Sequence, residues 1–430
     1  MSDSFQSRVM GQGLRWLNRL AGSRLLDDAG RRAGFTRLLY GASRTGFGAA
    51  GLANRPFRAV IKAARAARPA AARAPDLFDL QPTDEQQMLA DAARDFADHA
   101  IRPIAAAADR DHATGEELLT TAAELGLAAI QVPEEHGGTA AERAHTTQAL
   151  IAESLAHGDM GIALRLLSGA GVATLLAEYG SGAQQARFLP AFCEEQPPHA
   201  ALAIADGRDG TTTASEQAGG YRLRGCKPLV IDAGRAELFV VAAELDGREE
   251  LFLVESGSPG LRWTPQPAMG LHAASLSRLN LDDVAVPTDA RLPAVDAAAV
   301  RAAGRLGIAA LAAGTCRAVL DYVIPYANER QAFGEPISHR QAVAFLIADI
   351  GIELEGLRLL LLRAAARRDA GREIVRDAAL AHGMAVRQGR RIGSDGVQLL
   401  GGHGFVCEHP VERWYRDLCA VSALSTHFYL

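Results

Sequence analysis

The chain has 430 residues, of which 48% are hydrophobic and 22% charged, and its formal net charge is −5. These values are typical of a globular protein with two or three packed units. No uninterrupted apolar run approaches the ~20 residues of a spanning helix, and no apolar leader precedes a cleavage site, so neither a membrane span nor export is predicted. The five cysteines are scattered without metal-ligand spacing, which favours reduced thiols and no metal site.

The first 75 residues form a distinct basic arm. They hold fourteen Arg and Lys against three Asp, a net charge of +11, so the remainder carries −16. Leu14, Leu17 and Leu20 alternate with arginines, as in an amphipathic surface helix. We predict contact with anionic lipid, an acidic partner or the body of its own oligomer. A poorly ordered extension and a cleaved organellar presequence are alternatives, and nucleic-acid binding is not expected.

Helical patterns dominate the next segment. An Ala/Arg/Pro linker at 63–75 precedes residues 82–86, PTDEQ, whose Thr or Asp offers a helix cap with acids in the first turn. Helical periodicity continues to about 192, broken by VPEEHGG at 132–138. This stretch predicts an N-terminal helical domain over 79–197, after an arm and linker over 1–78.

The period changes between about 198 and 292. Short alternating or apolar runs at 221–224, 238–241, 251–254 and 279–287 predict strands of a β-barrel or sandwich, and we place this middle domain at 198–294. Helix returns from about 297 through a helical domain at 295–430. Its 341–363 stretch carries one apolar stripe, made of Val343, Ile347, Ile350, Leu354, Leu357 and Leu361. The element order predicts an α+β fold.

Two motifs near the C-terminal end offer ligand chemistry. In RQAFG, at 330–334, the guanidinium of Arg330 can fork onto a pyrophosphate, and Phe333 is expected on the same face of a helix that this motif opens. In QLLGGHGF, at 398–405, bare glycine backbone allows a ligand to approach closely. The plain alternatives are that Arg330 caps a helix or pairs with a nearby Glu, that the glycines cap a helix, and that His403 is simply solvated.

These motifs, followed by PVER at 410–413 and RD at 416–417, resemble the C-terminal helical domain of the acyl-CoA dehydrogenases, and the resemblance runs from about 80 to 427. It implies three domains, the last a four-helix bundle, and an FAD cofactor with an acyl-CoA substrate. It also implies a homo- or heterotetramer and an electron-transfer flavoprotein-like acceptor. The scattered cysteines favour a cytoplasmic location, and the basic arm adds possible peripheral membrane contact through 1–75. The resemblance assigns FAD contacts across a subunit boundary to Arg330, Phe333, Gln341, Gln398, Gly401 and Gly402.

The chain departs from this family where chemistry is expected. The usual glutamate base is Ser425, and the alternative base position on the first C-terminal helix is Gly304. Residues 204–210 lack the threonine, proline and serine of the family segment whose backbone and hydroxyls face the flavin ring. Within 225–231, Leu229 replaces the tryptophan that would flank the flavin, and Ile231 replaces a hydroxyl near its ring. Because serine is no base without an activating partner, the catalytic residue stays unassigned, with His427 as a weak candidate.

Three hypotheses therefore remain. The first is an FAD-dependent acyl-CoA dehydrogenase that performs α,β-desaturation with a relocated base. The second is a catalytically degenerate subunit of a heteromer, lending Arg330 to a partner's flavin. The third is a flavin monooxygenase of the same fold, in which no α-proton is removed.

Overall fold

The computed structural model describes residues 80–138, 144–293 and 295–430, and the basic arm with its predicted membrane contact lies outside them. The N-terminal part is helical. Thr83 caps its first helix through a reciprocal pair of hydrogen bonds with Gln86, so the predicted start is confirmed. The helices are α3 (Asp84–Phe96), a π turn η2 (Ala97–Ile101), α4 (Arg102–Asp111), α5 (Glu116–Glu124), α6 (His145–Gly158), α7 (Met160–Tyr179) and α8 (Gly182–Phe188).

The middle part is a seven-stranded sheet in the order β1-β4-β2-β3-β7-β6, with β5 paired to β4. Its ladders are antiparallel except that β4 runs parallel to β1 and β2. Four of these strands were predicted, whereas β1, β2 and β6 were not. The strands are β1 (Ala200–Ala203), β2 (Thr213–Gln217), β3 (Gly220–Val230), β4 (Leu238–Leu245), β5 (Arg248–Glu255), β6 (Leu261–Pro265) and β7 (Ser277–Pro287).

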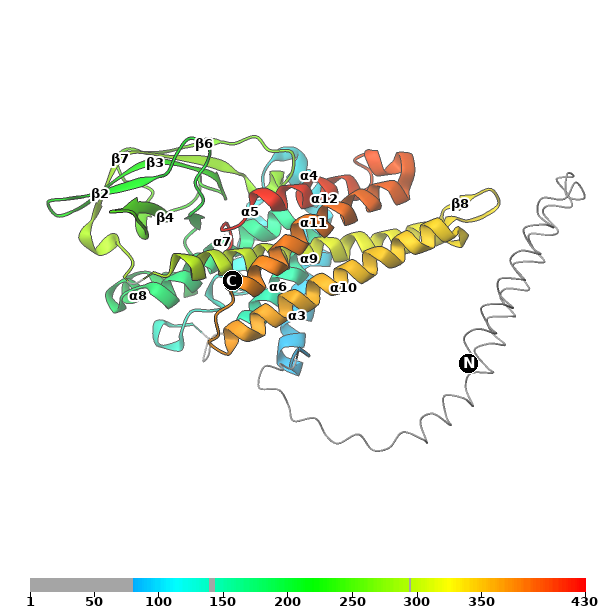
Figure 1. The fold of residues 1–430 in the computed structure, drawn as a ribbon, viewed down its shortest axis with the longest axis horizontal. Coiled ribbons are helices and arrows are strands. Elements are labelled where there is room, and N and C mark those ends of the chain that lie inside the picture. Colours follow the sequence, from blue (N-terminus) through cyan, green and yellow to red (C-terminus); the bar gives the residue numbers. More distant parts are fainter. Residues whose placement is uncertain (1–79, 139–143, 294) are drawn as a thin grey trace, which may run out of the picture. The chain divides into compact units, whose positions relative to one another are not determined.

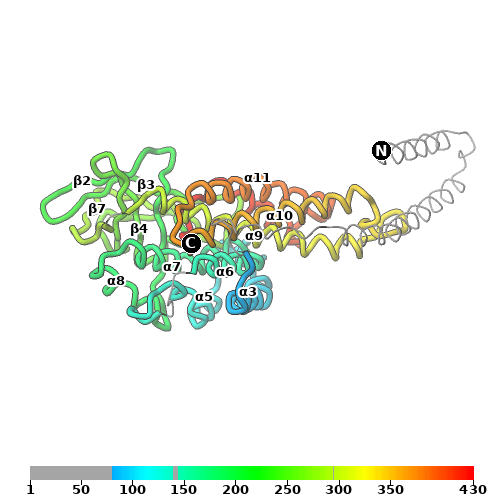
Figure 2. Tube along the Cα trace, turned by 60° about the horizontal axis from the view of Figure 1, so that its bottom comes forward, coloured from blue at the N-terminus to red at the C-terminus, as the bar shows by residue number. Residues whose placement is uncertain are grey.

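The C-terminal part is built from long helices that run side by side (Figures 1 and 2). The predicted apolar stripe of α10 faces the core: Ile350, Leu354, Leu357 and Leu361 are buried. Helix α6 of the N-terminal part packs against α9 and α10 and joins the two helical parts. The helices are α9 (Ala297–Glu329), α10 (Gln341–Asp369), α11 (Val375–Leu400) and the shorter α12 (Val411–Ala420).

Short 3₁₀ turns connect these elements: η3 (Leu127–Ala129), η4 (Glu134–His136), η5 (Leu189–Cys193), η6 (His272–Ala274), η7 (Thr288–Ala290), η8 (Ile337–His339), η9 (Gly401–Phe405) and η10 (Val421–Ala423). Helices α7 and α9 are long and apolar enough to cross a membrane by length and composition. Both are mostly buried inside the fold, however, as the central helices of a packed core are.

The prediction that RQAFG opens a helix is wrong. Helix α9 ends at Glu329, and Arg330 is its C-cap with extended backbone. The motif instead forms a small hairpin of β8 (Gln331–Ala332) and β9 (Glu335–Pro336). At its tip Phe333 and Gly334 have φ of 56° and 84°. A two-residue turn with a positive φ at both residues matches the twist of a hairpin. Glycine at position 334 adopts such a φ without steric cost. Phe333 therefore does not share a helical face with Arg330.

Candidate functional site

The residues predicted to contact a cofactor gather at one end of the C-terminal helices. Tyr326, one turn before Arg330, donates a hydrogen bond of 3.4 Å to the carbonyl of Leu400, which joins the ends of α9 and α11. The hairpin tip projects beyond α9 and α10, and Phe333 is 96% exposed there (Figure 1, β8). The structure thus brings together, all exposed, Arg330, Phe333, Gln341, Gln398, Gly401 and Gly402.

The backbone at this end is open. Gly401 caps α11 with φ 59°, as the plain reading of the glycines expected. A Cβ added to Gly401 or Gly402 would nevertheless meet nothing within 4 Å, so this backbone is accessible from outside. His403 is exposed beside it, 3.0 Å from the Tyr326 hydroxyl and stacked on His409. We call the region of Arg330, Phe333, Gln341 and 398–402 the bundle end.

The two family base positions meet elsewhere in the fold. A Cβ on Gly304, in the second turn of α9, would lie 2.7 Å from the carbonyl oxygen of Ser425 and 2.8 Å from the Cα of Thr426. Two positions far apart in sequence therefore border one space. Neither residue places a carboxylate there, and the backbone of Ser425 and Thr426 occupies the space beside Gly304.

Residues 425–430, which we call the C-terminal segment, continue into the core from this point. Phe428 lies against Gly307 of α9, where an added Cβ would come within 2.7 Å of its ring, and Tyr429 lies against Gly171 of α7. Both figures show the end of the chain among the helices (Figures 1 and 2). After Ser425 every side chain is at least 95% buried: Thr426, His427, Phe428, Tyr429 and Leu430.

A charged clamp holds the far end of the C-terminal segment. Arg368 of α10 donates to the Leu430 carbonyl, to the Tyr429 hydroxyl at 2.7 Å and to Glu178 of α7 at 2.9 Å. The Tyr429 hydroxyl in turn donates to Glu178. Burial alone would lower the pKa of Arg368, but Tyr429 and Glu178 outweigh it and raise that pKa. The segment is thus anchored by a buried ion pair as well as by apolar packing.

His427 faces the sheet, not an open cavity. Burial lowers its pKa to about 4, against a hydrogen bond to the backbone of Pro228 that acts to raise it. Its Nδ1 has no hydrogen-bond partner among the described residues. The ring is therefore neutral at pH 7 and a poor proton acceptor, and it ties the C-terminal segment to the end of β3.

The RD motif at 416–417 holds α12 in place. The buried carboxylate of Asp417 accepts a 2.6 Å hydrogen bond from the backbone of Leu271, and burial raises its pKa to about 8. Arg413 pairs at 3.0 Å with Asp159, the N-cap of α7, and Arg416 pairs with Asp109. These bonds tie α12 to the other two parts of the fold and so set where Ser425 begins.

Polar side chains at the strand ends near this segment are hydrogen-bonded to one another. Buried Lys227 donates to Asp206 at 2.6 Å and to the Ile204 carbonyl, and the Thr212 hydroxyl donates to Asp206 at 2.8 Å. Burial lowers the pKa of Lys227, while Asp206 opposes the shift. The β3–β7 register shifts between Lys227 and Val230, where Leu229 has φ 55°. Sequence reasoning had noted both motifs but missed the pair that joins them.

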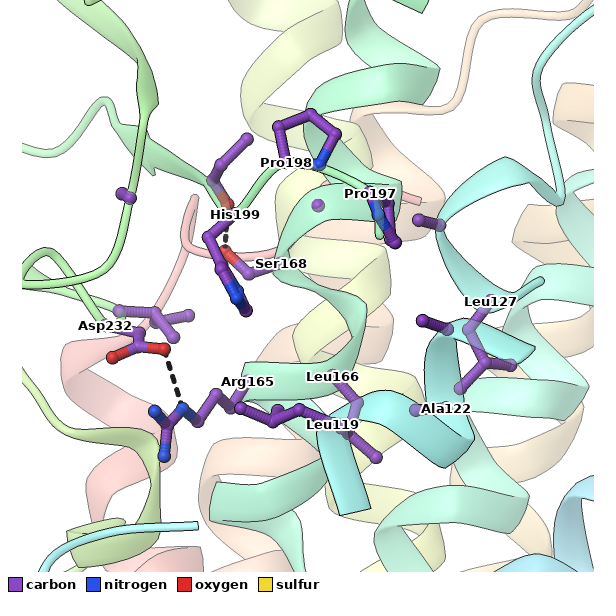
Figure 3. A pocket seen from close by; sticks show the side chains of 16 residues that line it. Leu119, Ala122, Leu127, Arg165, Leu166, Ser168, Pro197, Pro198, His199 and Asp232 are labelled. Atoms are coloured by element: carbon purple, nitrogen blue, oxygen red, sulfur yellow. Dashed lines mark hydrogen bonds and ion pairs between the residues drawn. The ribbon is translucent and has the colours of Figure 1, made fainter. Parts of the chain in front are cut away.

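A small cavity lies behind this turn (Figure 3). Arg165 of α7 pairs with Asp232 at 2.7 Å across it, and burial raises the pKa of Asp232 against the effect of Arg165. Its volume is about 60 Å³, whereas small-molecule sites usually occupy roughly 300–1,000 Å³. A neighbouring cleft of about 480 Å³ is lined by Trp263, Gln266 and His272, with no lining residue from α9 or from 425–430.

Comparison with known proteins agrees with this architecture. The chain matches the acyl-CoA dehydrogenase N-terminal domain over residues 83–196, the middle domain over 203–284 and the C-terminal domain over 298–424. The chain belongs to the acyl-CoA dehydrogenase family. The predicted α+β fold, with its helical, sheet and helical domains in that order, is confirmed.

Individual members of the family are similar along most of their length. The mitochondrial short-chain specific acyl-CoA dehydrogenase of Mus musculus is 31% identical over 78% of this chain and 85% of its own. The solved structure of butyryl-CoA dehydrogenase from Megasphaera elsdenii has a TM-score of 0.74 at 27% identity, covering 81% and 97% of the two chains. The structure of PigA with FAD and proline has a TM-score of 0.75 at 25% identity, covering 81% and 96%.

The fit of an acyl-CoA dehydrogenase flavin differs between the two regions. The bundle end offers a guanidinium and open glycine backbone, which suit a pyrophosphate. Beside Gly304 the space holds the C-terminal segment, which lies against Gly304, Gly307 and Gly171 and is hydrogen-bonded to the backbone of Pro228, and it does not fit a flavin ring. Gly304 and Arg330 are 26 residues apart on one helix, roughly 39 Å at 1.5 Å per residue. One dinucleotide therefore does not bridge them within a single chain.

Among the described residues there is also no group of three or more His, Cys, Asp or Glu side chains placed to hold a metal ion.

Proposed function

We propose that this chain is a subunit of an FAD-dependent acyl-CoA dehydrogenase-type oxidoreductase that oxidises an acyl-CoA thioester. In this proposal its bundle end contacts the FAD of a neighbouring subunit, and the α-proton is removed on a family partner that keeps the glutamate. The observation that supports it is the contrast between the open bundle end and the filled space at Gly304 and Ser425.

The chemistry of α,β-desaturation favours this division of labour. A weakly acidic α-proton must pass to a positioned base while a hydride leaves the β-carbon, and FAD supplies the hydride acceptor when bound. Among the described residues no side chain is hydrogen-bonded to the Ser425 hydroxyl to activate it, and Gly304 has no side chain. His427, with a pKa of about 4, is a weak base that faces Pro228. A proton acceptor from another chain removes this difficulty.

An exposed apolar face supports assembly with other subunits. Phe345, Ile352 and Leu359 recur every seven residues on α10, so they lie on one side of the helix, and they are 63%, 69% and 55% exposed. The opposite side of α10 faces the core. Exposed apolar side chains in such a row are typical of interaction surfaces. We infer a heterotetramer with a glutamate-bearing paralogue, reoxidised by an electron-transfer flavoprotein-like acceptor in the cytoplasm.

The alternatives predict different spectra. The chain is purified alone, supplied with FAD, and mixed anaerobically with a panel of acyl-CoAs. Our proposal predicts no bleaching of flavin absorbance, and bleaching that returns when a glutamate-bearing paralogue is co-expressed. Bleaching by the chain alone would show a stand-alone dehydrogenase and overturn the proposal. Yellow protein that instead consumes oxygen with reduced flavin would favour the monooxygenase.

The role of the bundle end is tested in the same co-expressed assembly. Arg330→Ala should lower the FAD content per assembly severalfold, because a pyrophosphate loses its bidentate donor, with no change in unfolding midpoint since Arg330 is exposed. Arg376→Ala, an exposed arginine at the opposite end of α11, is the matched control and should leave FAD content unchanged. Equal FAD content in both variants would exclude Arg330 from the flavin site.

A further inference from the structure

The space that both base positions border is where a substrate would have to react. A base on α9 and a base after α12 can serve the same α-carbon only if both face it. In this chain those positions lie in contact, with the Gly304 Cβ direction pointing at the backbone of Ser425 and Thr426. The α-carbon of an acyl thioester would therefore have to lie beside Gly304.

The C-terminal segment extends from this same point between α7 and α9. It leads with backbone at Gly304, continues with Phe428 at Gly307, and reaches Gly171 with Tyr429. An acyl chain reacting at Gly304 would need an apolar course of this kind. The three glycines let the segment lie directly on the two helices, since a Cβ at any of them would come within 2.7 to 3.1 Å of it.

We propose that the C-terminal segment is an intramolecular plug that occupies the acyl-binding space of its own subunit. The charged clamp of Arg368, Glu178 and Tyr429 closes the far end, and His427 secures the near end against Pro228. The plug excludes an acyl chain from this subunit while the bundle end stays open to a neighbour. This inference rests on the proposed function, but its test does not use turnover.

The first arm of the test compares the full chain with a chain ending at Leu424. Binding of octanoyl-CoA and of CoA alone is measured by calorimetry in excess FAD. The full chain should bind the two equally, because the acyl space is filled. The shortened chain should bind octanoyl-CoA at least 10-fold more tightly than CoA. Tenfold preference in the full chain, or no preference in a shortened chain that is folded, would overturn the plug.

The second arm places the effect in this space, and its full-length variant keeps the test valid if the shortened chain does not fold. A peptide of sequence STHFYL, added to the shortened chain, should compete with octanoyl-CoA but not with CoA. In the full-length background Phe428→Ala should create a measurable preference for octanoyl-CoA, whereas Leu380→Ala, at an exposed site on α11, should not. Absence of preference in folded Phe428→Ala together with failure of the peptide to compete would refute the proposal.

These outcomes are separate from those of the proposed function. A chain that stays unbleached even with the co-expressed paralogue but prefers octanoyl-CoA to CoA only after shortening would retain the plug and lose the partner hypothesis. A chain that bleaches only with the paralogue but prefers octanoyl-CoA to CoA at full length would do the reverse.

Discussion

Helix α9 carries a family landmark near each end, and the two ends are treated in opposite ways. At Arg330 the chain turns through an exposed hairpin beside glycines whose backbone faces open space. At Gly304 the chain lays its own backbone on the helix, too close for any side chain. Helix α9 thus exposes the region of Arg330, whereas Gly304 is covered by the C-terminal segment.

The difference shows that loss of a catalytic residue need not leave a vacancy. Where the glutamate would stand, the space is filled by Thr426 to Leu430, each at least 95% buried. Burying a large apolar side chain contributes about 1.5–3 kcal/mol, so the segment now stabilises the fold. Because the C-terminal segment now has a structural role, restoring one carboxylate does not restore catalytic activity. We expect Ser425→Glu alone to remain inactive.

The largest loss of stability is expected from a substitution in the charged clamp. Arg368→Met removes the cation that faces Glu178 inside the core, and breaking a buried pair by deleting one partner costs about 3–5 kcal/mol. We expect a loss of this size in the free energy of unfolding, measured by urea denaturation. Arg368→Lys, which keeps the charge but not the fork of donors, should lose less. An Arg368→Met loss below about 1 kcal/mol would show that the clamp does not hold the segment.

Much of the fold follows from local patterns that the sequence displays. The capping pair of Thr83 and Gln86, the alternating strands, and the stripe through Ile350 and Leu361 each signal their structure directly. The hairpin at 331–336 was missed because RQAFG was read as a helical period. The hairpin turn needs a positive φ at both Phe333 and Gly334. A search for the 3.6-residue helical period does not detect such a turn.

The site was predictable in position but not in state. Counting along the family pattern paired Gly304 with Ser425, and the structure brings them into contact. Phe428, Tyr429 and Leu430 are apolar and favour burial, but nothing local in 425–430 indicates where they pack, because the contact surface includes glycines on two distant helices. Arg165 carried a usable signal: it is a charge within a mostly apolar helical stretch, which implies a buried partner, although not its identity.

The closed end is tested more finely at Gly304. Gly304→Ala forces a Cβ against backbone atoms of the C-terminal segment, and such overpacking costs about 1–3 kcal/mol. Gly383→Ala is the matched control in an open part of α11 and should be neutral or stabilising by up to about 1 kcal/mol, the helix propensity difference. In the chain ending at Leu424 the cost at Gly304 should shrink towards that of the control. A cost unchanged by shortening would mean that Gly304 serves α9 and not the segment.

The smallest expected effect is a pH dependence at His427. Its pKa is lowered to about 4 when folded and is about 6.5 when unfolded. The unfolded chain therefore binds more protons between these values, and the stabilisation is complete above pH 6.5 and lost as pH falls towards 4. At pH 5.5, one unit below the unfolded value, the loss is about 1.4 kcal/mol.

Other histidines titrate in this range, so the measured quantity is the difference between the full chain and His427→Gln in urea unfolding at pH 7.5 and 5.5. His427→Gln should destabilise less on acidification by that amount. Equal pH dependence in the two proteins would place His427 in water and the C-terminal segment outside the core.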